Sequence, residues 1–103
     1  MTTYQEQLAI PNHGTGAYDI AADEENEILF ITFRNDTTVD LVDAKLLTSA
    51  GYTTLEGITN PTAIVYAQNQ KYFLALQRTT NKLYVYTWDY INKSLTALYE
   101  EPY

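Results

Sequence analysis

The sequence predicts an all-β fold, and three observations carry this prediction. Ten of the 103 residues are tyrosine, and threonine, isoleucine and valine are frequent, all of which favour β-strands. Residues 28–33 and 72–76 are nearly unbroken apolar runs of strand length, the pattern of strands covered on both faces. Clusters rich in Asn, Asp and Thr separate the runs, as hairpin turns do. We therefore expect a meander of hairpins in which these two runs are the most buried elements.

The expected elements follow in order along the chain. An N-terminal strand is expected over 4–10, because this segment and the following Pro11 and Asn12 mirror 52–58 and the turn after it. Each later strand is an apolar or β-branched run bounded by turn residues. These strands are expected over 17–22, 28–34, 38–43, 52–57, 62–67, 71–78, 82–89 and 95–101.

The two halves of the chain resemble each other in pattern. A shift of 44 residues, reduced to 43 for the last strand, brings related segments together: Ile20 onto Ile64, 28–33 onto 72–77, 39–42 onto 83–86, and 52–55 onto 95–98. We therefore divide the single domain, 1–103, into a closing strand at 1–11, a first repeat at 17–57 and a second repeat at 61–101. A chain of 103 residues has room for only one such domain.

A four-stranded unit of about 44 residues with a buried second strand resembles one blade of a β-propeller. The resemblance is architectural, because no Trp-Asp or Gly-His repeat signature is present. Two blades cannot close a ring, so the resemblance implies a homo-oligomer, with three chains giving six blades. Some small lectins are similar to this, with two blades per chain in a trimer. The alternative fold is a single-chain β-sandwich of eight or nine strands.

The net charge of −7 lies entirely in the first half of the chain. Residues 1–50 carry nine acidic residues against Arg34 and Lys45, whereas residues 51–103 carry four of each sign. Six scattered basic residues do not form a surface for nucleic acid, so we expect no nucleic-acid partner. The acidic half could dock a basic protein, or it could simply be a solvated face.

Few residues suit catalysis or metal binding. The chain has no cysteine, and His13 is its only histidine, so we expect no zinc site, no cofactor and no Ser-His-Asp hydrolase. The acidic segment 23–27 lacks the spacing of a dedicated calcium loop and is interpreted as an exposed turn. The segment 11–16 has two glycines but no phosphate-loop Lys, and is interpreted as a turn with His13 exposed or at an edge. We therefore expect a protein that is not an enzyme.

An aromatic ladder is the most specific chemical feature. Tyr84, Tyr86, Trp88 and Tyr90 follow a period of two, which places four rings on one face of a strand. Broad rings with polar edges suit stacking on a sugar, a base or a flat partner surface, so these residues and His13 are the candidate ligand-binding residues. The alternative is that the ladder packs one sheet on its neighbour.

Two functional hypotheses follow. The first is an oligomeric ligand-binding module that holds a glycan or another small planar ligand near the aromatic residues. The second is a structural or accessory assembly subunit, for example of a viral particle, or an acidic inhibitor of a basic protein. No apolar run is long enough to span a bilayer and residues 1–6 do not resemble a signal peptide, so we expect no membrane insertion. These features leave the localisation unknown, and both a cytoplasmic and a virion-associated protein are compatible with them.

Overall fold

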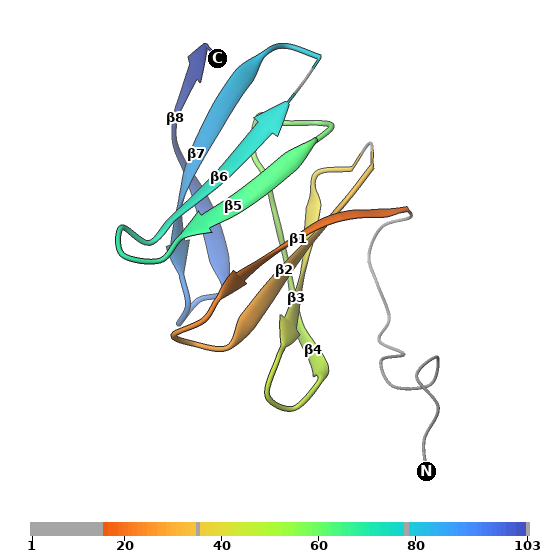
Figure 1. The fold of residues 1–103 in the computed structure, drawn as a ribbon, viewed down its shortest axis with the longest axis vertical. Coiled ribbons are helices and arrows are strands. Elements are labelled where there is room, and N and C mark those ends of the chain that lie inside the picture. Colours follow the sequence, from red (N-terminus) through yellow and green to blue (C-terminus); the bar gives the residue numbers. More distant parts are fainter. Residues whose placement is uncertain (1–15, 35, 78, 103) are drawn as a thin grey trace.

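The computed structural model describes residues 16–102 except 35 and 78. In this part of the chain there is no helix, and therefore none that could cross a membrane. The strands form two four-stranded antiparallel sheets, each in sequential order (Figure 1). The predicted all-β fold is thus confirmed, whereas the closing strand expected over 1–11 lies outside the described residues.

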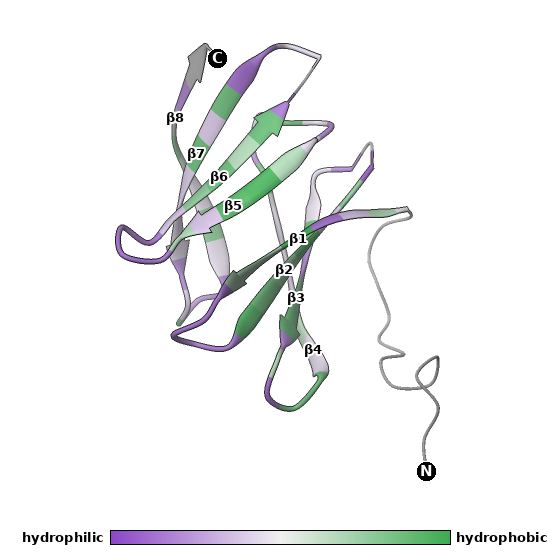
Figure 2. Cartoon of the chain, viewed as in Figure 1, coloured by the Kyte–Doolittle hydropathy of each residue, from purple (hydrophilic) through white to green (hydrophobic). Residues whose placement is uncertain are grey.

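Each sheet is an antiparallel meander, in which strands that are consecutive in the sequence are neighbours in the sheet. The first sheet contains β1 (Ala17–Asp23), β2 (Ile28–Phe33), β3 (Thr38–Asp43) and β4 (Thr48–Thr54). The second contains β5 (Ala63–Ala67), β6 (Tyr72–Gln77), β7 (Lys82–Asp89) and β8 (Ser94–Pro102). Figure 2 shows hydrophilic residues in most of the turns, with the exception of the turn between β3 and β4, and hydrophobic residues along β2, β5 and β6.

The two sheets have the same register at a shift of 44 residues. In the first sheet Ile20 pairs with Ile31, and in the second Ile64 pairs with Ala75. Apart from the first pair of β1, every other residue pair between β1, β2 and β3 has its counterpart 44 residues later. A β-bulge also occurs at the same position of the third strand, after Leu41 in one sheet and after Val85 in the other. The internal repeat therefore extends to the pairing of the backbone.

The fourth strands match at a different shift from the one expected. Asp43 pairs with Thr48, and the equivalent Thr87 pairs with Thr96, so the shift for the last strand is 48 residues and not 43. The hairpin between β7 and β8 is longer by two residues on each strand, which explains the difference. The fourth strand of the first sheet also begins at Thr48, earlier than predicted, because only residues 44–47 form its turn.

The core lies between the two sheets, where alternate side chains of both meet. β1 lies against β5 and β4 against β8, so strands of equal rank face each other (Figure 1). At the centre the Phe30 ring lies 5.0 Å from Phe73 and 4.9 Å from Trp88, both edge to face. Leu55 and Ile58, in the connection between the sheets, are fully buried at one end of this core. The sheets do not close into a ring, and two facing sheets fit both a pair of blades and a sandwich.

The strands predicted to be covered on both faces are covered on one. On β2, Ile28 and Phe30 are buried toward the second sheet, while Leu29 and Ile31 on the opposite face are half-buried. β6 alternates in the same way. The most continuous burial occurs instead on β3, where four consecutive residues from Val39 are buried. We call the faces that meet between the sheets the inner faces, and the two opposite ones the outer faces.

Candidate functional site

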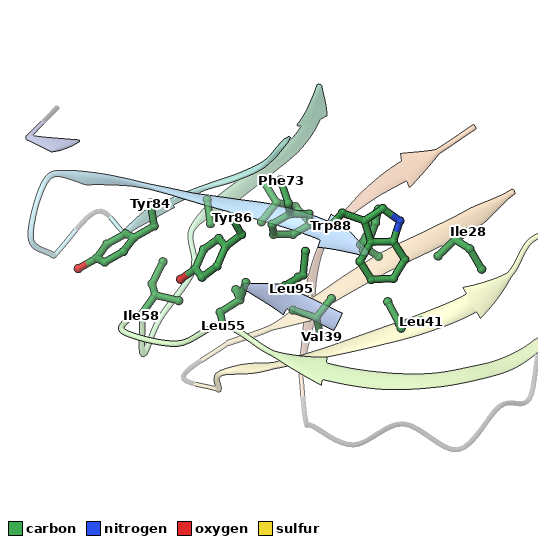
Figure 3. Close-up of a cluster of buried hydrophobic side chains, with 13 residues drawn as sticks. Ile28, Val39, Leu41, Leu55, Ile58, Phe73, Tyr84, Tyr86, Trp88 and Leu95 are labelled. Carbon is green, nitrogen blue, oxygen red and sulfur yellow. The ribbon is translucent and has the colours of Figure 1, made fainter. Parts of the chain in front are cut away.

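Three rings of the aromatic ladder are part of the core. Tyr84, Tyr86 and Trp88 are 8%, 0% and 7% exposed, and they point from β7 toward the first sheet and the connection that carries Leu55 and Ile58 (Figure 3). The structure therefore shows the alternative interpretation for these three residues, in which the ladder packs one sheet on the other. Burial to this extent leaves little ring surface on which a ligand could stack.

The other two candidate residues lie elsewhere. Tyr90 is half-buried in the turn after β7, where the Lys93 ammonium lies 3.9 Å from the centre of its ring. Its ring thus contacts a cation of its own turn. His13 lies outside the described residues. Tyr90 also packs, partly buried, against the core cluster that contains the other three rings.

Trp88 is held by a buried carboxylate of the first sheet. Its indole Nε1 donates a hydrogen bond of 2.9 Å to Oδ2 of Asp23, which is fully buried at the end of β1. Gln68 donates to Oδ1 at 2.8 Å, and Asn26 donates to Oδ2 at 2.8 Å. Asp23 therefore joins the turn after β1 to the turn after β5 and to the middle of the core.

These hydrogen bonds keep Asp23 ionised. Burial raises the pKa of this carboxyl, but hydrogen bonds from Asn26, Gln68 and Trp88 outweigh burial and hold the pKa below its usual range. Burial, together with the Asp23 and Glu25 carboxylates, raises the pKa of the nearby Tyr66 to about 12. The interpretation of 23–27 as an exposed turn is thus wrong for Asp23, which is structural.

A second carboxylate of β1 also crosses between the sheets. Asp19 accepts hydrogen bonds from the backbone N–H of Ile20 and of Ile64, each at 2.8 Å. We call Asp19, Asp23 and their partners in the second sheet the inter-sheet clamp. The clamp was not predicted from the sequence, because acidic residues next to turns are normally exposed to solvent. The only available signal was the spacing of Asp19 and Asp23, which places both on the same face of β1 as Ala21.

A cavity of about 250 Å³ opens beside the buried ladder. Gly57 in the connection between the sheets has φ of 90°, a conformation that favours glycine, and an added Cβ would lie 3.7 Å from the Tyr84 ring. The Tyr86 hydroxyl donates to the Glu56 carbonyl at 2.8 Å, and burial raises the pKa of Tyr86. The lining residues are Glu56, Gly57, Tyr84, Val85, Tyr86, Ala97, Leu98 and Glu100.

Two acidic residues, Glu56 and Glu100, line this cavity together with the apolar Leu98. Glu100 also forms an exposed ion pair with Lys82 at 3.2 Å. Trp88 does not line this cavity. Among the described residues no group of three or more His, Cys, Asp or Glu could hold a metal ion.

Apolar side chains remain exposed on both outer faces. Ile20 is 56% exposed on the outer face of the first sheet, next to a second cavity of about 320 Å³ lined by Tyr18 and Ile31 among others. On the outer face of the second sheet Val65 is 55% exposed. If further sheets stacked on this chain, they would contact these two outer faces.

Comparison with known proteins adds no assignment: neither a protein-family model nor a curated protein matches this sequence.

Proposed function

We propose that this chain is an assembly module whose copies join through their outer sheet faces into a propeller-like ring. One observation carries the proposal: β2 and β6 are apolar on both faces, but the single chain buries only one face of each. Strands of this composition are normally covered on both sides. A neighbouring sheet of the same kind is the covering layer that a propeller supplies.

The repeat supports a ring in preference to a closed single-chain sandwich. A repeat unit that stacks on one neighbour still has a free face, and stable arrays need further units or caps. The sheets of this chain stack with equal strands facing each other, so a third and fourth blade can be added by the same step. Three chains would give six blades, within the range of known propellers.

Native mass spectrometry and sedimentation velocity of the full chain at micromolar concentration test this proposal. We expect a closed homo-oligomer, with the trimer as the main species, because a ring leaves no outer face exposed. A protein that is monomeric throughout the micromolar range would contradict the proposal and leave the sandwich interpretation.

A second candidate function is the binding of a glycan in the cavity beside Tyr84. The observation that favours it is the pair of carboxylates, Glu56 and Glu100, which can accept hydrogen bonds from sugar hydroxyls at an apolar wall. This site is next to the aromatic ladder but does not require its buried rings to stack.

Screening against a glycan array, followed by calorimetric titration, tests this second function. For any glycan that binds, Glu56→Gln should weaken affinity by about tenfold, the effect of losing one charge-assisted hydrogen bond. Glu24→Gln is the matched control, because Glu24 lies exposed in the distant turn after β1. Equal affinity of the Glu56 variant and the control would exclude the cavity as the site.

A further inference from the structure

We infer that copies of this chain stack head to tail, with the outer face of the second sheet of one copy on the outer face of the first sheet of the next. The two copies would stack as the two sheets do within one chain, with strands of equal rank facing each other. This inference rests on the proposed function, and it specifies which surfaces meet and which partner they accept, namely a second copy.

The shift of 44 residues relates the outer face of the first sheet to the inner face of the second sheet. The inner face of the second sheet, which packs on the first, includes Ile64, Phe73 and Ala75. Their counterparts Ile20, Leu29 and Ile31 have the same strand pairing but lie on the outer face of the first sheet. Along its first two strands, the first sheet therefore presents outward the kind of surface that the second sheet buries. On the third strand Asp40 and Val42, both buried, take the places of Tyr84 and Tyr86.

The reverse equivalence holds as well. The inner face of the first sheet is built from Ile28, Phe30, Val39 and Leu41, all of them buried. Their counterparts on the outer face of the second sheet are Tyr72, Leu74, Leu83 and Val85, which are all apolar or aromatic. The two outer faces are therefore complementary in the same sense as the two inner faces.

The contrast in exposure shows where cover is missing. Ile64 is 9% exposed against the first sheet, whereas the equivalent Ile20 is 56% exposed. Val65 is 55% exposed, whereas the equivalent Ala21 packs against the core. In a head-to-tail contact Val65 takes the place of Ala21, and Ile20 of the next copy takes the place of Ile64. The two most exposed large aliphatic residues in the strands of the outer faces would thus be covered together.

The inter-sheet clamp does not recur at this contact. Asp19 and Asp23 have Ala63 and Ala67 as counterparts on the second sheet, so the first strand of that sheet brings no carboxylate to the junction. Covering this strand therefore costs no desolvation of a charge. Along the first strands, the contact between copies is then apolar. The contact within the chain, in contrast, contains the hydrogen bonds of Asp19 and Asp23 to the second sheet.

A contact between two different faces has a consequence for symmetry. Each copy offers one face of each kind, so the stack grows in one direction until it closes. If instead identical faces met, each contact would be a two-fold dimer, and blocking one face would leave the other dimer intact. Variants that block a single face distinguish these two arrangements.

The test uses the full chain with Ile20→Lys, Val65→Lys, and their equimolar mixture, examined by native mass spectrometry. Each residue is more than half exposed, so neither lysine should lower the unfolding midpoint by more than a few degrees. We expect each variant alone to be monomeric, and the mixture to give a one-to-one heterodimer and nothing larger. Ile91→Lys is the matched control, since Ile91 is 81% exposed in a turn away from both faces, and it should assemble like the unchanged protein.

Other outcomes overturn the inference in distinguishable ways. If Ile20→Lys or Val65→Lys alone forms a homodimer, or if their mixture stays monomeric while the unchanged chain assembles, head-to-tail stacking is wrong but assembly stands. If the unchanged chain is itself monomeric, the proposed function fails, and this inference fails with it.

Discussion

At the scale of single residues, Asp23 does more for this fold than its neighbours in the acidic segment. It is fully buried, and it receives hydrogen bonds from Trp88 and Gln68 in the second sheet, whereas Glu24 and Glu25 are exposed. A buried carboxylate that loses one of its donors pays most of the desolvation cost of that missing bond. The indole N–H of Trp88 therefore stabilises the junction beyond the packing of its ring.

This role predicts a specific effect of Trp88→Phe. The variant keeps an aromatic ring beside Phe30 but removes the donor to Asp23, so the free energy of unfolding at pH 7 should fall by about 2–3 kcal/mol. Chemical denaturation at pH 7 measures this loss. A change below about 0.5 kcal/mol would show that this hydrogen bond does not stabilise the junction.

The dependence of the free energy of unfolding on acidic pH also tests the role of Asp23. Because the pKa of Asp23 is lower in the folded protein than in the unfolded chain, its contribution is present above about pH 4 and is lost as the pH falls through the folded value. Asp23→Asn removes this dependence. The stability gap between the unchanged protein and Asp23→Asn should therefore narrow below pH 4.

At the scale of elements, the first hairpin of each sheet depends on one residue with a left-handed backbone. Glu27 and Lys71 have φ of 56° and 60° at equivalent positions, and their carbonyls accept hydrogen bonds from Ala44 and Trp88, again 44 residues apart. This conformation costs an ordinary residue about 1 kcal/mol, and more for a β-branched one. The two equivalent turns therefore adopt the same backbone geometry, although the left-handed residue lowers the stability of each slightly.

Substitutions at Glu27 should show this cost. Glu27→Val should lower the free energy of unfolding by about 1–2 kcal/mol, whereas Glu27→Gly should leave it unchanged or raise it slightly. Glu24→Val in the same turn is the control, because Glu24 does not have a positive φ. Equal losses for Glu27→Val and Glu24→Val would show that β-branching itself, and not the left-handed backbone, is the cause. Thermal unfolding of the three variants provides the measurement.

At the scale of the whole molecule, the acidic excess and the apolar outer faces of β2 and β6 have different consequences for assembly. The acidic excess lies in the first half, and one of its residues, Glu25, pairs with Lys71 of the second half at 3.4 Å in an exposed position. Exposed pairs of this kind contribute little and are screened by salt. The outer faces are apolar along β2 and β6, so the oligomer expected by mass spectrometry should persist at high salt in sedimentation experiments.

The sequence alone determined the strands, because a period of two, the β-branched and aromatic residues, and the Asn- and Asp-rich turns act locally. It also determined the 44-residue repeat through the first three strands of each sheet. It predicted a shift of 43 residues for the fourth strands, where the structure has 48, because the added length of the β7–β8 hairpin changes the pairing without leaving a clear pattern. Only the tertiary structure decided that Tyr84, Tyr86 and Trp88 fill the core and that Asp23 is buried. Alternation says that residues share a face, but the opposing sheet decides whether that face meets protein or water.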